Sequence, residues 1–72
     1  MEPTSKEAKL SVIASHIRDI KTDMYDAELY ILTHRAQGAK YAEYVGRLEE
    51  DIRLFSKQIE DLEIQYNFIE SE

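Results

Sequence analysis

The sequence has no cysteine, a single proline and only two glycines among its 72 residues. Without cysteine the chain forms neither a disulfide framework nor a thiolate metal site, and it has no thiol nucleophile. Because glycine and proline are scarce while Glu, Leu, Lys, Ala and Ile dominate, the composition favours helices over strands. A chain of this length forms at most one domain, and its core must be thin.

Positive charge is also in short supply, with 9 Lys and Arg against 15 Asp and Glu and a net charge of -6. The imbalance is concentrated in residues 37–72, which hold four Lys or Arg against nine Asp or Glu, whereas residues 1–36 hold five against six. An acidic chain without a basic stripe repels phosphate backbones and anionic lipids, so we expect neither nucleic acid nor a membrane as a partner. Residues 1–7 lack the cationic and apolar segments of a secretory signal, and no apolar run is long enough to span a bilayer. We therefore expect a cytoplasmic protein.

What the sequence does contain is a succession of positions, almost all apolar, that are spaced alternately three and four residues apart. We call these positions the central row: Leu10, Ile13, Ile17, Ile20, Met24, Ala27, Ile31, His34, Gly38, Tyr41, Val45, Leu48, Ile52, Phe55, Ile59, Leu62, Tyr66 and Ile69. The mean spacing is that of a heptad repeat, which predicts an all-α coiled-coil fold. Only His34 and Gly38 interrupt the apolar character of the row, and both lie near its midpoint.

The first helix is expected to start near residue 5, because Thr4, preceded by Pro3 and followed three residues later by Glu7, has the form of a capping box. Gly38 suits the left-handed conformation that ends a helix. We therefore predict one helical domain over residues 1–72, with a first helix at about 5–35, a turn at about 36–40 and a second helix at about 41–70.

Folding the chain at this turn pairs the two halves of the central row in a long antiparallel helical hairpin. The opposed pairs include Ile31 with Val45, Met24 with Ile52, and Ile17 with Ile59. The same register brings Asp23 toward Asp51 and Glu28 toward Glu49, which are pairs of like charge. The hairpin thus gains apolar contacts along its length and accepts some repulsion at the edges of the contact.

One continuous helix is the alternative architecture. The heptad spacing passes through the midpoint without a change of phase, and no Ser, Thr, Asp or Asn stands between Ala36 and Tyr41 to cap a second helix. A single helix of about 65 residues would be roughly 95 Å long and would join copies of itself in a coiled coil that serves as a structural spacer.

Further apolar residues lie off the central row and would be exposed in a lone hairpin. They are Tyr25, Leu29, Tyr30, Leu32 and Ala36 in the first half and Tyr44, Leu54, Ile64 and Phe68 in the second. Contiguous exposed apolar patches mark interfaces. We therefore expect either a homo-oligomer, in the first instance a dimer whose two hairpins form a four-helix bundle, or a docking face for another protein. The predicted interface residues are Ile17, Ile20, Met24, Tyr25, Leu29, Tyr30, Leu32, Tyr44, Ile52, Phe55, Ile59 and Leu62.

No pattern of catalytic, cofactor-binding or metal-ligating residues is present, so we expect no enzyme activity, no cofactor and no metal. His16 and His34 lack ligand partners at helical spacing, and the acidic residues lack the turn glycines of a calcium loop. The predicted function is a non-enzymatic protein–protein interaction module. A small-ligand-binding oligomer is the alternative, with a pocket between subunits near His34, Arg35, Lys40 and Tyr41.

The turn Gly38-Ala39-Lys40-Tyr41, in which a tyrosine follows a glycine and opens the second helix, resembles the turn of the co-chaperones of type III secretion needle subunits. The helices expected for this chain are longer than those of that family. In outline the chain is also similar to small phage-encoded inhibitors and to repressor-of-primer-like bundles. These resemblances imply a helical hairpin with an adaptor, chaperone-like or inhibitor role.

Overall fold

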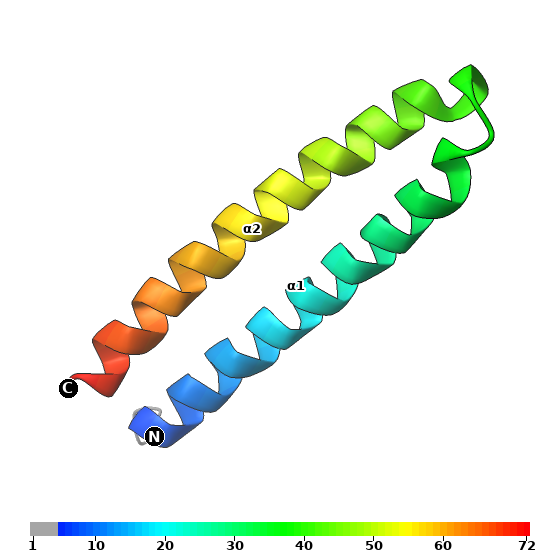
Figure 1. The fold of residues 1–72 in the computed structure, drawn as a ribbon. Coiled ribbons are helices and arrows are strands. Elements are labelled where there is room, and N and C mark those ends of the chain that lie inside the picture. The colour runs from blue at the N-terminus through cyan, green and yellow to red at the C-terminus, as the bar shows by residue number, and fades with distance from the viewer. Residues whose placement is uncertain (1–4) are drawn as a thin grey trace.

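A computed structural model of the chain describes residues 5–72. Helix α1 covers Lys6–Arg35 and helix α2 covers Ala42–Glu70, and the turn between them ends in the short 3₁₀ helix η1, Ala39–Tyr41. The two helices run antiparallel and pack against each other (Figure 1). The predicted all-helical hairpin is therefore confirmed. The alternative of one continuous helix is wrong, because the chain reverses its direction between α1 and α2.

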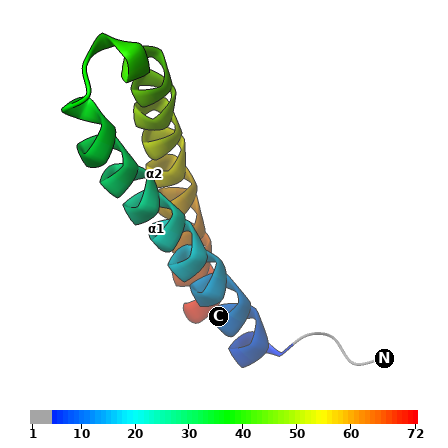
Figure 2. The same cartoon turned by 90° about the vertical axis from the view of Figure 1, so that its right-hand side faces the viewer.

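The hairpin is a rod of 54 × 17 × 16 Å, with the turn at one end and the C-terminus at the other (Figure 2). Its radius of gyration of 16.6 Å exceeds the roughly 11 Å of a compact domain of the same length. A rod of two helices has no region that is shielded on all sides. Among residues 5–72, only five apolar residues are buried, namely Ala27, Ile31, Val45, Ile59 and Ile69.

Burial follows the central row. Every residue of the row except Gly38 is buried or half-buried, whereas outside the row Ser15 is the only described residue that is less than exposed. In a molecule of two helices this burial comes from the opposite helix, so α1 and α2 contact each other through the row. Contacts at three levels along the rod record the register of the helices: Lys6 with Glu70, Met24 with Ser56, and His34 with Tyr41.

Helix α1 begins with Ser5 as its N-cap, since the Oγ atom of Ser5 accepts a hydrogen bond of 3.1 Å from the backbone N–H of Ala8. The expected capping residue, Thr4, lies outside the described residues, and the observed cap stands one position further along. The next residue, Lys6, donates from Nζ to the carbonyl oxygen of Glu70 at 2.8 Å. This contact places a positive charge at the negative end of the α2 dipole and links the start of α1 to the end of α2.

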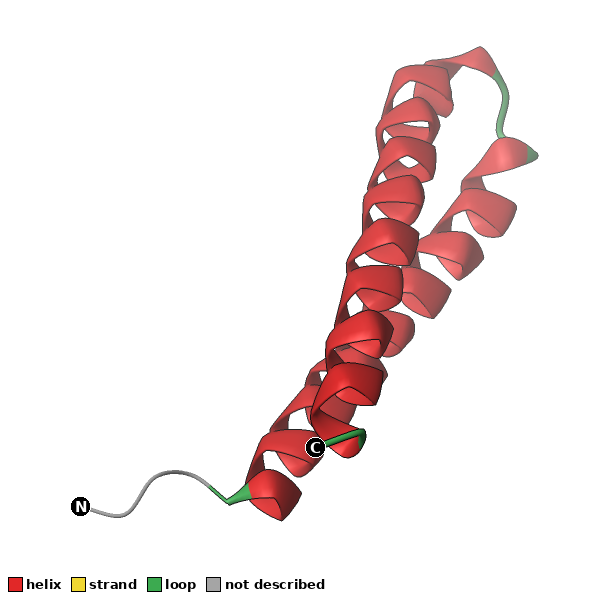
Figure 3. Ribbon diagram, turned by 90° about the vertical axis from the view of Figure 1, so that its left-hand side faces the viewer, coloured by secondary structure: helices red, strands yellow, loops and turns green. Residues whose placement is uncertain are grey.

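The turn depends on Gly38, whose backbone has φ 85° and ψ -162°. The positive φ agrees with the prediction, but the predicted left-handed helical conformation is wrong, because this ψ lies in an extended region that is open essentially to glycine alone. The N–H of Gln37 donates to the carbonyl of His34 at 3.0 Å, and the N–H of Tyr41 donates to the carbonyl of Gly38 at 3.3 Å. No side chain caps the N-terminus of η1 or of α2. The connection, drawn as a loop between the helices in Figure 3, is held by these two backbone bonds and by a longer one of 3.5 Å from the N–H of Gly38 to the carbonyl of Arg35.

Candidate protein-binding surfaces

Nine large apolar side chains are exposed among residues 5–72: Val12, Tyr25, Leu29, Tyr30, Leu32, Tyr44, Leu54, Ile64 and Phe68. Eight of them belong to the off-row residues that the sequence pointed to, and Ala36, the ninth of those, is also exposed. Val12 was not among the residues predicted from the sequence. The hairpin therefore leaves nine large apolar side chains exposed, whereas five apolar residues are buried among residues 5–72.

Three of these side chains form a contiguous row on α1. Tyr25, Leu29 and Leu32 follow one another at intervals of four and three residues, which places them on the same side of the helix. Their exposed fractions are 61%, 43% and 65%. Because Ala27 and Ile31 are buried against α2, these three residues lie on the outer side of α1. We call Tyr25, Leu29 and Leu32 the α1 row, and they make α1 apolar on both its inner and its outer side.

A second surface is a groove between the two helices, with a volume of about 270 Å³. It is lined by Asp23, Asp26, Ala27 and Tyr30 from α1 and by Tyr44, Leu48, Asp51 and Phe55 from α2, and we call it the aspartate groove. Its floor consists of Ala27, which is buried, and of Leu48 and Phe55, which are half-buried. Ala27 has the smallest side chain of the central row apart from Gly38, which leaves room between the helices at this level.

The rim of the aspartate groove carries unbalanced negative charge. Asp23, Asp26 and Asp51 are exposed, and no Lys, Arg or His lines the groove with them. None of the three forms a salt bridge within the described part of the chain. The salt bridges found there lie on α2 and are highly exposed: Arg47 with Glu43 at 3.9 Å and Lys57 with Asp61 at 3.5 Å. The three carboxylates are thus free to meet positive charge from outside the chain.

Aromatic rings hold the turn end of the groove in place. The rings of Tyr30 and Tyr44 meet edge to face across the groove, with their centroids 5.1 Å apart. The ring of His34 stacks on that of Tyr30 with the centroids 3.8 Å apart, and it meets the ring of Tyr41 edge to face at 4.9 Å. His34 Nδ1 lies 3.0 Å from the carbonyl oxygen of Tyr30, so it carries the proton when this hydrogen bond forms. These contacts join α1, η1 and α2 in one aromatic cluster.

The predicted interface residues divide into two groups in the structure. Seven lie between the helices and are buried or half-buried: Ile17, Ile20, Met24, Ile52, Phe55, Ile59 and Leu62. Five are exposed: Tyr25, Leu29, Tyr30, Leu32 and Tyr44. The first group already serves the contact between α1 and α2, so a partner reaches most of these side chains only at their edges. The second group is open to a partner without any change in the hairpin.

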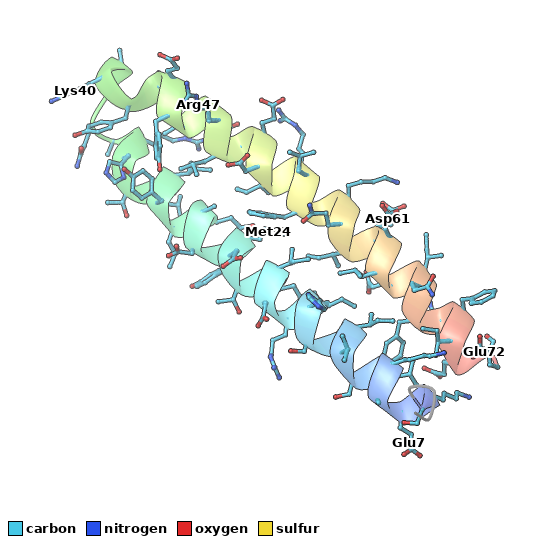
Figure 4. The ribbon with its side chains drawn as sticks, turned by 180° about the vertical axis from the view of Figure 1, so that it is seen from behind. Glu7, Met24, Lys40, Arg47, Asp61 and Glu72 are labelled. Atoms are coloured by element: carbon cyan, nitrogen blue, oxygen red, sulfur yellow. The ribbon has the colours of Figure 1, made fainter. Side chains whose placement is uncertain are left out.

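The ligand pocket was predicted between subunits, and within the single hairpin its residues do not line one hollow. His34 and Arg35 line one hollow at the turn end, whereas Lys40 lines another with Arg47, and Tyr41 lines neither. Lys40 and Arg47 appear in Figure 4 near the turn, far from Glu7 and Glu72 at the other end of the rod. No group of three or more His, Asp or Glu residues within residues 5–72 is arranged to hold a metal ion. Neither α1 nor α2 is long and apolar enough to cross a membrane.

The aspartate groove was not predicted from the sequence, in which Asp23 and Asp51 were seen only as a repulsive pair at the edge of the helix contact. Two signals were present. The hairpin register opposes Asp23 to Asp51, and Tyr30 and Tyr44 each directly precede a residue of the central row. Together these positions place aspartates and tyrosines along the same edge of the helix contact, where the structure shows the groove.

Comparison of the chain with models of known protein families, with curated proteins and with solved structures finds no match. The interpretation of function therefore rests on the geometry and charge of the α1 row and the aspartate groove.

Proposed function

We propose that the chain is a non-enzymatic protein-binding module, a small adaptor, chaperone-like or inhibitor protein that acts by coiled-coil packing of its helices. The observation that carries this proposal is the exposed α1 row. Burying one leucine side chain completely is worth about 1.5–3 kcal/mol, and the hairpin leaves Leu32 65% exposed on a helix whose inner side is already covered. A second helix laid along the α1 row recovers part of this free energy at each residue of the row.

The first partner that we propose is a second copy of the chain. Helix α1 holds five Lys or Arg and five Asp or Glu, whereas α2 holds three against eight. Over its whole length α1 carries no net charge, so two α1 helices repel each other less than two α2 helices do. Packing the α1 rows of two hairpins together produces a four-helix bundle with α1 at its centre and the acidic α2 outside.

The test is the mass of the purified chain, measured by sedimentation equilibrium over a wide range of concentrations. We expect two chains at high concentration and one on dilution. The variant Leu32→Asp places a charge in the proposed interface and is expected to raise the dissociation constant about 100-fold or more. Leu54→Asp is the matched control, because Leu54 is similarly exposed, at 57%, but lies on α2. This control is expected to dimerise like the wild type.

Circular dichroism checks that both variants keep their helix content. A Leu32→Asp variant that dimerises as tightly as the wild type would contradict the proposed role of the α1 row. Equal weakening by Leu54→Asp would mean that association does not depend on this surface, and a wild-type chain that is monomeric at every concentration would rule out self-association.

A further inference from the structure

We propose that the aspartate groove binds a cationic amphipathic segment of a partner protein, in which Lys or Arg side chains flank apolar ones. This inference rests on the proposed function, since it states the chemistry of the partner that a protein-binding hairpin holds. It concerns a surface that shares no residue with the α1 row.

The composition of the groove matches the two parts of a Lys or Arg side chain. The aliphatic stem of such a side chain packs well on apolar surface, which the floor of Ala27, Leu48 and Phe55 provides. The charged head then reaches the carboxylates on the rim, which come from both helices and have no cation of their own. The rings of Tyr30 and Tyr44 add faces on which a guanidinium or ammonium group is attracted.

The charges also decide between a second copy and a different protein as the occupant. In a second copy the α1 row offers no cation, because residues 22–34 contain no Lys or Arg, and the Lys and Arg of residues 6–21 accompany only one exposed large apolar residue, Val12. The α2 helix of a second copy carries eight acidic residues against three basic ones and is repelled by the groove. A partner segment with apolar residues flanked by Lys or Arg meets both requirements, and its charge speeds the encounter with an acidic chain.

The shape of the groove favours a segment of protein over a small molecule. Its volume of about 270 Å³ is at the small end of the roughly 300–1,000 Å³ of typical small-molecule pockets. The groove lies along the contact of two antiparallel helices that form a rod 54 Å long. An amphipathic helix laid parallel to the rod inserts one or two side chains into the groove, and its other apolar residues follow the edge of the helix contact.

The probe for the test is a synthetic peptide of leucine and lysine in heptad order, and its counterpart is a peptide in which glutamate replaces lysine. Binding to the full chain is followed by fluorescence anisotropy, and the site is mapped by amide chemical shifts. We expect the lysine peptide to bind and to shift the amides of Asp23, Tyr30, Tyr44 and Asp51 most strongly. The glutamate peptide is expected not to bind.

Two double variants with the same change of net charge separate the groove from the general acidity of the chain. Asp23→Asn with Asp51→Asn removes charge from both sides of the groove and is expected to weaken binding about tenfold or more. Glu50→Gln with Glu60→Gln removes the same charge from exposed positions of α2 outside the groove. This control is expected to weaken binding less than about twofold.

Equal weakening by the two double variants would overturn the inference, because net charge alone would then explain the binding. Chemical shifts centred on the α1 row, or equal binding of the two peptides, would overturn it as well. If the chain dimerises through Leu32 and the lysine peptide does not bind, this inference fails and the proposed function stands. If the chain neither dimerises nor binds either peptide, the proposed function fails with it.

Discussion

The two glycines provide a test of the hairpin in which only the backbone conformation matters. A Cβ atom built at Gly38 or at Gly46 meets no other atom within 4 Å, so replacing either glycine by alanine creates no clash and fills no cavity. The positions differ in their backbone, since Gly38 has φ 85° in the turn and Gly46 lies inside α2. The changes Gly38→Ala and Gly46→Ala are therefore a matched pair.

The two changes are expected to act in opposite directions. Alanine at position 38 must adopt a conformation that is essentially restricted to glycine, which costs about 1–3 kcal/mol. Alanine at position 46 replaces a flexible residue inside a helix and stabilises it by about 0.5–1 kcal/mol. Because 1 kcal/mol shifts the melting temperature of a domain of this size by about 4–8 °C, Gly38→Ala should melt roughly 10 °C below the wild type. Gly46→Ala should melt a few degrees above it.

The assay is thermal and urea unfolding followed by far-UV circular dichroism. All variants are compared at the same protein concentration, because self-association stabilises the folded state by mass action. In a continuous helix both glycines would have helical backbones, and both alanine variants would be more stable than the wild type. A stabilising effect of Gly38→Ala would therefore refute the turn and with it the hairpin. Chemical synthesis with D-alanine at position 38, which favours positive φ, is expected to remove the loss.

Three further predictions concern the orientation of α2, the start of α1 and the length of the rod. Ile59→Ala should lower the free energy of unfolding by about 2–4 kcal/mol, because Ile59 is buried. Ile64→Ala, at a residue that is 61% exposed, should lower it by less than about 0.5 kcal/mol in the monomer. Equal losses of the two variants in urea unfolding would contradict the orientation of α2. Ser5→Ala removes the N-cap of α1 and should lower the free energy of unfolding by about 1 kcal/mol, whereas Ser11→Ala inside α1 should raise it by a few tenths of a kcal/mol. If the cap is absent in solution, both changes will be neutral or stabilising. Small-angle scattering of the monomer should give a maximum dimension little above 54 Å, and a value near the roughly 95 Å of one long helix would contradict the reversal.

The fold was largely predictable because one periodic signal determines both the helices and their contact. A spacing of three and four residues keeps the central row on one side of each helix, and the row is where the structure buries side chains. The reversal was harder to predict, since the spacing passes through the turn unchanged. Gly38 favoured a reversal of the chain over a continuous helix. The sequence did not distinguish a left-handed helical conformation at Gly38 from the extended one that is observed.

The details that the sequence did not predict depend on choices between chemically similar residues or on side-chain volume. Thr4 and Ser5 both offer a hydroxyl group for a cap, and neighbouring helix starts differ little in free energy. The aspartate groove requires both the register of the hairpin and the small side chain of Ala27 at one level of the row. Periodicity records which residues face the other helix, but it does not record how completely they fill the space between the helices.

The two proposed surfaces use different residues, and this separation has a consequence for binding. A dimer formed through the α1 rows presents two aspartate grooves, one on each hairpin. A partner with two cationic segments then binds its second groove at a high effective concentration, provided that its linker spans the distance between the grooves. The variant Leu32→Asp is accordingly expected to bind a single lysine peptide as tightly as the wild type and to lose the gain in affinity for a tandem of two such peptides. An unchanged tandem affinity in this variant would show that the two surfaces do not cooperate.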